Sequence, residues 1–415
     1  MLPIASSARQ FTTPVDALFT ATSAVCVTGL VVLDTGTHWS TFGQTVLLVL
    51  FQIGGLGFMT GATIILAAIG RGLGLREKVV MTESFGLKSP GYIAALVKRL
   101  TVYSLIIESI GAAIFYFHWQ LNGAAQYSLF TAVFHSVSAF NNCGMDLFSN
   151  FKSLISQQSD AIFLLTTAVL IILGGLGFLV VEDIFRKKKF NKLSLESKVV
   201  LRTTLGLIVC GTVYFFIAEY SSAGTLGPLT IPEKIVVAFF QAVTPRTAGF
   251  SAIDINNLKE VSLFFTMFLM FVGGATGSAA GGIKVNTFGL LIIIAISYLR
   301  GSERVEAFGR ELTIQNVHRA IVLVLFFIVS IGVTVLLLSI TETFKFDAIL
   351  FEAFSAFGTV GLSTGISTGL SRAGRIIIII AMFIGRLGPL TLFAIATGRR
   401  IPVDKGYPSE SIRIG

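Results

Sequence analysis

The sequence predicts an all-α polytopic membrane protein, built as a pseudo-fourfold pore of four helix–pore-loop–helix repeats, the first of which lacks its leading helix. Composition is the first observation behind this fold class. Of the 415 residues, 53% are hydrophobic and only 13% are charged, and the mean hydropathy is +0.83, a balance that soluble domains do not have. The second observation is a series of apolar runs long enough to cross roughly 30 Å of hydrocarbon. These runs cover about 42–70, 93–118, 160–182, 199–218, 262–299, 317–340 and 374–397.

The third observation is a polar, glycine-terminated dip that occurs four times along the chain. The dips end at Gly29, Gly144, Gly249 and Gly361. Each is followed 24 to 30 residues later by a second glycine cluster, at 53–57, 173–177, 272–277 and 384–388. Glycine lets backbone carbonyls turn toward a shared axis, and rings of carbonyl oxygens can replace the hydration shell of a cation. A unit repeated four times around one axis therefore predicts a pore.

A short amphipathic segment precedes each dip. These segments cover about 14–25, 127–139, 232–243 and 346–357. They are too short to span a bilayer and end in turn-prone sequence, so we expect half-helices that enter the membrane and stop. Non-helical backbone at that depth persists only where it lines a water-filled cavity or is buried in protein. If the half-helices enter from outside, their negative dipole ends meet near the membrane centre and favour a cation there.

The repeats divide the chain into five parts. We assign 1–70 to repeat 1, 92–185 to repeat 2, 196–300 to repeat 3 with an intramembrane gating loop, 315–398 to repeat 4 and 399–415 to a cytoplasmic tail. Only residues 1–13 precede the first half-helix, so we expect the leading span of repeat 1 to be missing. Either the chain is truncated or the first unit is incomplete.

The net charge of +9 reflects membrane topology rather than nucleic-acid binding. Basic residues concentrate in 71–99, 183–202 and 300–319 and in the tail, whereas 31–41 and 119–134 contain none. This asymmetry is the positive-inside bias, so the basic regions are expected to face the cytoplasm. The basic run at 187–189 is more typical of a solvated, lipid-adjacent face than of a docking site. The predicted environment is a lipid bilayer, with no nucleic-acid partner.

Candidate ion-filter residues are the glycines and the two residues before each of them. The preceding pairs differ between units, which indicates that main-chain oxygens bind the ion while side chains support the turn. No Asp or Glu lies in a dip, so a hard monovalent cation suits the site better than a divalent one. The alternative is four ordinary glycine turns in re-entrant loops. The candidates are Val27, Thr28, Gly29, Asn142, Cys143, Gly144, Thr247, Ala248, Gly249, Thr359, Val360 and Gly361.

The third glycine cluster is a candidate gate. Ten residues with small side chains follow one another inside the apolar stretch 262–299. Because each glycine costs a helix about 1 kcal/mol relative to alanine, we expect a mobile, partly unwound segment below the filter. The alternative is tight helix–helix packing through small residues. The residues are Gly273, Gly274, Ala275, Thr276, Gly277, Ser278, Ala279, Ala280, Gly281 and Gly282.

Two cations accompany the gate, and a third lies in a dip. Charges inside a membrane span are costly and usually functional. We expect Arg386 to face the central axis, hydrogen-bond carbonyls of the gate and act as an electrostatic barrier. Lys284 is a second gate candidate, with snorkelling to the cytoplasmic surface as the alternative. Arg246 is expected to point away from the pore and anchor its loop, with Asp254 as a candidate partner.

Other polar residues are expected to support the fold. Thr20, His135 and Glu352 lie nine residues before a dip glycine and are interpreted as buried hydrogen-bonding residues of the half-helices. Glu108 lies in mid-span and is interpreted as a packing-network acid without a named partner. The cysteines have no metal-ligand spacing and are interpreted as packing residues, with a disulfide between Cys26 and Cys143 as the alternative. No metal site and no catalytic residues are assigned.

These motifs resemble the Trk/Ktr/HKT superfamily of potassium transporters, most closely its bacterial KtrB-type subunits. The likeness rests on 28–30, 138–142, 241–250 and 354–362. It implies a homodimer in the bacterial cell membrane, with multiple spans, that takes up potassium in a channel-like way. It also implies a cytosolic nucleotide-binding ring of the KtrA type, with ATP or ADP on that ring and no cofactor in this chain. The glycine-rich segment is similar to the gating loop of that family, and stimulation by sodium is left open.

Two other function classes were weighed. An intramembrane enzyme lacks support, because no paired nucleophile and base, metal motif or carboxylate couple occurs in the sequence. A truncated, non-conducting membrane scaffold or paralogue stays open, because of the incomplete first unit.

Overall fold

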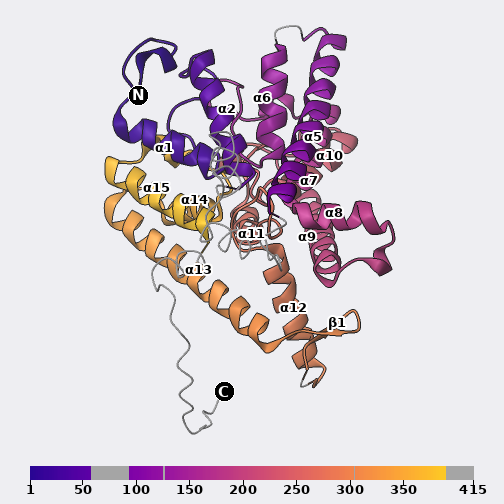
Figure 1. The fold of residues 1–415 in the computed structure, drawn as a ribbon. Coiled ribbons are helices and arrows are strands. Elements are labelled where there is room, and N and C mark those ends of the chain that lie inside the picture. The colour runs from indigo at the N-terminus through magenta and orange to yellow at the C-terminus, as the bar shows by residue number, and fades with distance from the viewer. Residues whose placement is uncertain (58–92, 125–126, 303, 389–415) are drawn as a thin grey trace.

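The computed structural model describes residues 1–57, 93–124, 127–302 and 304–388, and this part is mostly helical (Figure 1). Three helices are long: α5 (Ile93–Leu121), α9 (Leu195–Glu219) and α13 (Ile314–Thr341). A two-stranded antiparallel hairpin, β1 (Glu306–Ala307) and β2 (Arg310–Glu311), connects α12 (Val285–Leu299) to α13. The described residues also include five short 3-10 helices: η1 (Pro3–Ala5), η3 (Ile155–Gln157), η4 (Phe190–Lys192), η5 (Ile255–Asn257) and η6 (Ile366–Gly369).

Four short helices occupy the positions where half-helices are predicted. They are α1 (Pro14–Val25), α6 (Leu129–Phe140), α10 (Ile231–Val243) and α14 (Phe346–Gly358). Their starts follow local capping chemistry. The Thr13 hydroxyl accepts a hydrogen bond from Asp16 N ahead of Pro14, and Thr230 forms a capping box with Glu233. Both devices satisfy backbone N–H groups that a helix start leaves unpaired.

A second helix follows each half-helix and ends at or just before a glycine cluster. These helices are α2 (Thr41–Gly55), α7 (Ala161–Gly175), α11 (Glu260–Phe271) and α15 (Arg372–Leu387). Two more helices continue the chain on the far side of a cluster: α8 (Phe178–Lys187) after α7, and α12 (Val285–Leu299) after α11.

Three predicted spans, 93–118, 199–218 and 317–340, agree with α5, α9 and α13 to within four residues at each end, whereas two others are interrupted. Within the described residues, three helices have the length and apolarity to cross a membrane, and a fourth candidate arises if α7 and α8 count as one span. The 160–182 run is bent by 95° between α7 and α8, and the 262–299 run is divided by a non-helical segment. The ends of the 42–70 and 374–397 runs, most of the 71–99 loop and the 399–415 tail lie outside the described residues.

The packing of the helices is cyclic. The second helix of each unit contacts the half-helix of the next: α2 lies against α6, α7 against α10, and α11 against α14. The last unit then returns to the first, because α15 packs against α1. The long helices α5, α9 and α13 pack on the half-helices α6, α10 and α14 of their own units. The four half-helices therefore lie inside a ring of second helices.

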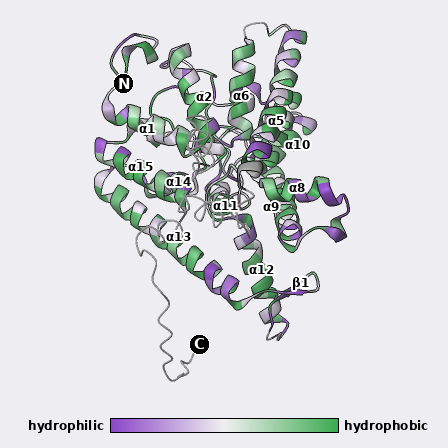
Figure 2. Cartoon of the chain, in the orientation of Figure 1, coloured by the Kyte–Doolittle hydropathy of each residue, from purple (hydrophilic) through white to green (hydrophobic). Residues whose placement is uncertain are grey.

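The long helices keep large apolar side chains exposed. Phe117 on α5 is 62% exposed, Ile217 on α9 71% and Leu336 on α13 65%, and the outer length of α13 is predominantly hydrophobic (Figure 2). Apolar surface of this extent fits contact with lipid rather than with water. The interior, by contrast, contains the half-helices, with Phe134, Phe240 and Phe351 fully buried.

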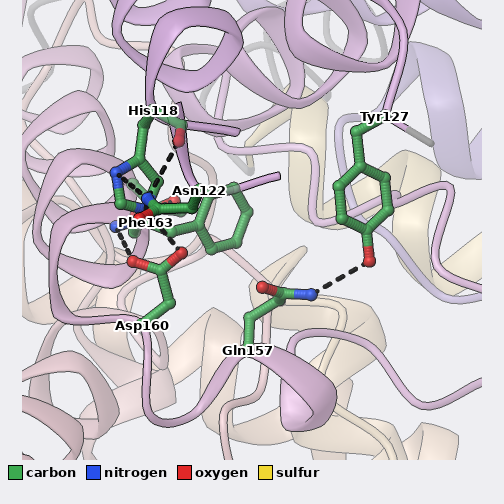
Figure 3. A network of polar contacts seen from close by, with 7 residues as sticks. His118, Asn122, Tyr127, Gln157, Asp160 and Phe163 are labelled. Carbon is green, nitrogen blue, oxygen red and sulfur yellow. Dashed lines mark hydrogen bonds and ion pairs between the residues drawn. The ribbon is translucent and has the colours of Figure 1, made fainter. Parts of the chain in front are cut away.

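A polar network ties the end of α5 to the start of α7 (Figure 3). His118 Nε2 lies 2.7 Å from Asp160 Oδ2, and the amide of Asn122 donates to the His118 carbonyl at 2.9 Å. The other oxygen of Asp160 accepts from Phe163 N at 3.0 Å, which caps α7. A second bond, from Gln157 Nε2 to the Tyr127 hydroxyl at 3.1 Å, fixes the neighbouring loop. The network fixes the outer frame of the second unit.

Candidate functional site

The four glycine dips share one backbone conformation. In every dip, the glycine and the residue two positions before it have positive φ. Left-handed backbone costs a non-glycine residue roughly 1–2 kcal/mol, and three of these residues are β-branched. Strain repeated at four equivalent positions indicates a common role. The φ values are 53° and 91° at Val27 and Gly29, 57° and 75° at Asn142 and Gly144, 72° and 75° at Thr247 and Gly249, and 50° and 96° at Thr359 and Gly361.

The four dips meet in a closed cycle. A Cβ atom added to each glycine would collide with the carbonyl oxygen of the residue before the next glycine, and the fourth dip returns to the first. The four separations are 2.3 Å (Gly29 to Cys143), 2.6 Å (Gly144 to Ala248), 2.6 Å (Gly249 to Val360) and 2.1 Å (Gly361 to Thr28). Any side chain at these positions would force the backbone of a neighbouring turn to move. We call these four turns the glycine ring.

Hydroxyl groups of the half-helices hold the ring in place. Their role was not predicted from the sequence, although a hydroxyl residue lies six positions before the glycine in three units and five positions before it in the other. In two units the hydroxyl accepts from the glycine N–H, and in two it donates to the carbonyl after the glycine. The pairs are Ser23 with Gly29 N (3.1 Å), Ser355 with Gly361 N (3.0 Å), Ser138 with Met145 O (2.6 Å) and Thr244 with Phe250 O (2.5 Å).

Two of the three predicted support residues brace the chain just beyond a ring glycine. His135 accepts from Leu147 N at 3.3 Å through Nε2, while its Nδ1 lies 2.9 Å from a carbonyl of its own helix. Glu352 is fully buried and accepts from the hydroxyls of Ser363, at 2.9 Å, and Ser367. Thr20 differs, because its hydroxyl donates to a carbonyl within α1.

The interpretation of Glu108 as a packing-network acid is confirmed, and its partner is Asn141. The Asn141 amide donates to Glu108 Oε1 and to Gln52 Oε1, both at 2.9 Å. The three residues come from α5, from the end of α6 and from α2, so the network links the second turn to helices of two units. Cys26 and Cys143 are free thiols, so the disulfide alternative does not hold.

A cavity of about 300 Å³ opens beside the glycine ring, and all four ring glycines line it. Its wall contains the carboxylates of Asp34, Asp146 and Asp254 and the ammonium of Lys152. Burial raises the pKa of Asp146 to about 7; the hydrogen bond from Phe148 N opposes this shift, and the nearby Asp34 adds to it. The cavity has more acidic than basic groups, which favours cations at the ring. We call it the vestibule.

The glycine-rich segment between α11 and α12, residues 272–284, is a compact non-helical loop. Its two ends are joined, because Gly273 N donates to Ile283 O at 2.8 Å and Val285 N to Gly274 O at 2.9 Å. The alternative of a continuous helix packing through small residues is therefore wrong. The loop also rests on the end of α7, where Gly175 O accepts from Ala275 N at 2.8 Å.

The loop lies directly against the ring. A Cβ added to Gly281 would be 1.9 Å from Thr359 Oγ1, and one added to Gly273 would be 3.2 Å from Thr247 Cγ2. Buried polar atoms gather at this contact. The hydroxyls of Thr28, Thr247 and Thr359 are buried and make no hydrogen bond within the described part of the chain, an arrangement that is rare in proteins.

Arg386 connects three units beneath the ring. Its guanidinium donates to the carbonyls of Ala279, in the loop, and Gly54, at the end of α2. The expected hydrogen bond to a loop carbonyl is thus present. Lys284 donates to Ala280 O at 2.6 Å, so its ammonium binds the loop instead of extending toward the cytoplasmic surface.

Arg246 is anchored away from the ring, as expected, but the prediction that Asp254 is its partner is wrong. Its guanidinium contacts Thr204 Oγ1 on α9 at 3.3 Å. Asp254 instead caps η5, where it accepts from Asn256 N at 3.0 Å. The aspartate lies on the vestibule wall, and the arginine turns back into the helix bundle.

The second glycine clusters mark close approaches between helices. In three units, a Cβ on a cluster glycine would collide with a carbonyl at the end of the same unit's half-helix, so only glycine allows the two helices to cross there. The separations are 2.0 Å (Gly54 to Val25), 1.8 Å (Gly174 to Phe140) and 2.0 Å (Gly385 to Phe357). The third unit differs, because its cluster forms the loop.

Comparison with known proteins places the chain among cation transporters. A family model described as TrkH, a cation transport protein, matches residues 2–404. The Ktr system potassium uptake protein B of Bacillus subtilis (strain 168) is 42% identical, over 100% of this chain and 92% of the relative. The protein of the same name from Vibrio alginolyticus is 38% identical, over 96% and 88%.

One further relative and one solved structure are also similar to this chain. The potassium/sodium uptake protein NtpJ of Enterococcus hirae is 37% identical, over 100% of this chain and 92% of the relative. The crystal structure of the potassium transporter TrkH from Vibrio parahaemolyticus superposes with a TM-score of 0.72, over 96% of this chain and 82% of that one. At 20% identity, the structural likeness speaks for the fold alone.

Proposed function

The chain belongs to the TrkH family of cation transport proteins, and from this premise we propose that it is a potassium-selective, channel-like uptake subunit of the bacterial cell membrane. The observation that carries the proposal is the closed cycle of four strained glycine turns. Membership of the family indicates cation transport, and the names of the relatives indicate that the cation is potassium. The glycine ring is the proposed site at which the ion is recognised.

We propose that the carbonyl oxygens of the ring form the ion filter, with the four units in pseudo-fourfold arrangement. The carbonyl before each ring glycine lies beside the glycine of the preceding turn in the cycle, and the cyclic packing of the second helices supports the fourfold order. The four residues that carry these carbonyls have unlike side chains, Thr28, Cys143, Ala248 and Val360, so coordination falls to the main chain. Carbonyl oxygens replace the hydration shell of a monovalent cation.

Ions would reach the ring through the vestibule. Its three aspartates exceed its single lysine in charge, which raises the local concentration of cations. The half-helices end at the ring, so their carboxyl-terminal dipoles add a negative potential there. Each such dipole contributes roughly 0.3–1 kcal/mol to the binding of a cation.

Passage beyond the ring would be controlled by the loop at 272–284. The loop contacts the Thr247 and Thr359 side chains and is tied to α15 by Arg386. In this position the loop would block the axis, and the Arg386 charge would repel an approaching cation. The buried threonine hydroxyls fit this role, because an ion or water passing between ring and loop would supply the hydrogen-bond partner that the described residues do not.

Assembly with other subunits is part of the proposal. The names of two relatives describe a Ktr system, which implies a membrane subunit that works with other components. We propose a homodimer regulated by a cytosolic ring of the KtrA type, which would bind ATP or ADP while this chain holds no cofactor. The name of the Enterococcus hirae relative includes sodium, so stimulation by sodium belongs to the same proposal.

Growth rescue tests the proposed function. The chain is expressed in bacteria that lack potassium uptake, and growth is measured at low external potassium. The purified chain is then placed in vesicles, and uptake of Rb⁺ is measured with and without competing K⁺ or Na⁺. Rescue, with uptake that K⁺ inhibits more strongly than Na⁺, is the expected result. A folded, membrane-inserted chain that gives neither would point to the non-conducting scaffold.

A further inference from the structure

Helix α8 turns sideways where a membrane span would continue. It leaves α7 at 95° after Gly177, whose φ is +82°, and it extends sideways from the bundle (Figure 1). If α7 crosses the bilayer, α8 lies nearly parallel to the membrane surface. Its depth is set by α9, because Asp183 accepts from Ser194 N and from the Ser197 hydroxyl, both at 2.8 Å. Those two serines cap and begin α9 at its predicted cytoplasmic end.

The exposed end of α8 combines aromatic and basic side chains. Phe185 is 70% exposed and Phe190 is 39% exposed, while the helix and the segment after it become strongly hydrophilic at this end (Figure 2). Aromatic rings beside basic groups are typical of helices that lie in a membrane interface. The basic residues here are Arg186, Lys187, Lys188, Lys189 and Lys192, all exposed. Among them, Lys187 alone has an acidic partner within the described residues, Asp183 at 2.7 Å.

The basic segment is held at a fixed depth. The Arg202 guanidinium lies over the ring of Phe190 at 5.3 Å and over that of Phe308 at 4.5 Å. The Lys198 ammonium donates to Asn191 O at 2.9 Å. Both cations belong to the first turns of α9, with Lys198 just before and Arg202 near the start of its predicted apolar run, 199–218. The segment is therefore fastened at the level where α9 passes from polar surroundings into hydrocarbon.

The other end of α8 touches the loop at 272–284. Phe178 N donates to Gly277 O at 3.2 Å, and a Cβ on Gly177 would lie 2.8 Å from Thr276 O. Val180 and Val181 share a buried apolar cluster with Val272 and Ala275. A displacement of α8 would therefore disturb the loop directly.

We propose that α8 and residues 186–192 bind the headgroups of anionic phospholipids in the cytoplasmic leaflet. Bound lipid stabilises α8 in the position seen here, and α8 in turn keeps the loop beneath the ring. The consequence for transport rests on the proposed function, whereas lipid binding itself does not. Charge complementarity favours this occupant: four of the five clustered cations have no acidic partner among the described residues, and the exposed aromatics suit hydrocarbon rather than a water-filled contact.

The test compares two variants that each lose four exposed basic residues. The first carries Arg186→Gln, Lys188→Gln, Lys189→Gln and Lys192→Gln. The matched control carries Arg300→Gln, Arg304→Gln, Arg310→Gln and Arg319→Gln, which are also exposed and predicted to be cytoplasmic. Binding of phosphatidylglycerol to the purified full chain is measured by native mass spectrometry, with phosphatidylcholine as the reference lipid. Thermal unfolding in detergent checks that both variants fold.

We expect the α8 variant to bind phosphatidylglycerol at least tenfold more weakly and the control to change less than twofold. Leak of Rb⁺ from vesicles should be higher without phosphatidylglycerol, and the α8 variant should lose this dependence. Equal lipid binding by both variants and the wild type would overturn the proposal. The proposal would also be overturned if the α8 variant bound lipid normally but no longer bound the soluble regulatory subunits. That result would identify residues 186–192 as a protein-docking surface. A wild type that binds phosphatidylglycerol through α8 but carries no Rb⁺ would refute the proposed function and leave the lipid site standing.

Discussion

Replacing Arg386 should open the pore, and the structure sets the size of the effect. The guanidinium makes two charge-assisted hydrogen bonds, of which the one to Ala279 O joins α15 to the loop. A hydrogen bond to a charged group contributes about 1.5–3 kcal/mol net. If the loop leaves Arg386 when it opens, Arg386→Gln removes that contribution from the closed state alone. The ratio of open to closed molecules should rise about 10- to 100-fold, because each 1.4 kcal/mol is a factor of ten.

The assay is efflux of Rb⁺ from vesicles that contain the chain without any soluble partner. Arg375→Gln is the matched control, because it removes a cation from the same helix whose partner is Asp16 rather than the loop. Arg386→Lys separates the two roles of the arginine. It keeps the positive charge, which repels ions, but one ammonium cannot reproduce a planar, two-armed contact.

We expect strong leak for Arg386→Gln, intermediate leak for Arg386→Lys and wild-type flux for Arg375→Gln. Thermal unfolding of each variant shows whether the protein is intact. Flux of folded Arg386→Gln that equals that of Arg375→Gln would refute the role of the arginine in holding the loop.

Three further predictions concern the loop, the ring and the vestibule. Deletion of 275–282 should leave a leakier pore, because the contacts with Thr359 and Arg386 are lost; unchanged Rb⁺ flux would limit the segment to packing. Ser355→Ala leaves Gly361 N unpaired, at a cost of about 1–3 kcal/mol, so it should lower the unfolding temperature and weaken discrimination against Na⁺, whereas retained discrimination would count against bracing of the ring. Asp146→Asn, assayed at pH 8, should raise the KM for K⁺ roughly twofold to tenfold at low ionic strength and less in high salt; a salt-independent change would argue against electrostatic attraction.

Local sequence chemistry was sufficient to place the half-helices. The 14–25 segment coincides with α1, and 127–139 differs from α6 by no more than two residues at either end. Their starts follow capping residues, and their ends follow the glycine dips. Capping residues and glycine turns act on residues that are close in sequence, so the helix ends that they determine can be predicted from the sequence.

The breaks within two of the apolar runs could not be predicted from apolarity. The 262–299 stretch is predominantly apolar, yet it contains a loop that forms backbone hydrogen bonds with Gly174, with Gly175 and between its own ends. Hydrophobicity indicates that a segment is shielded from water, but it does not distinguish a membrane-spanning helix from a loop that is buried in protein. The bend after Gly175 is hidden for the same reason.

Partners distant in the chain were the least accessible from sequence. Arg246 contacts Thr204, on a helix 42 residues earlier, and not the nearby Asp254. The strain of the ring was also hidden, because Val27, Asn142, Thr247 and Thr359 share a backbone conformation but belong to three residue types. The bracing hydroxyls could have been found, since their offsets from the ring glycines nearly repeat in all four units.

The most direct test of the ion filter is the preference of Gly249→Ser for K⁺ over Na⁺. A Cβ there would lie 2.6 Å from Val360 O, so serine must displace a ring carbonyl. Gly123→Ser is the control, because Gly123 has a similar φ of +72° and none of the described residues places an atom within 4 Å of its Cβ position. Competition by K⁺ and Na⁺ for Rb⁺ uptake should show at least a tenfold loss of selectivity for Gly249→Ser and none for Gly123→Ser. Wild-type selectivity in folded Gly249→Ser would contradict the assignment of the glycine ring as the filter.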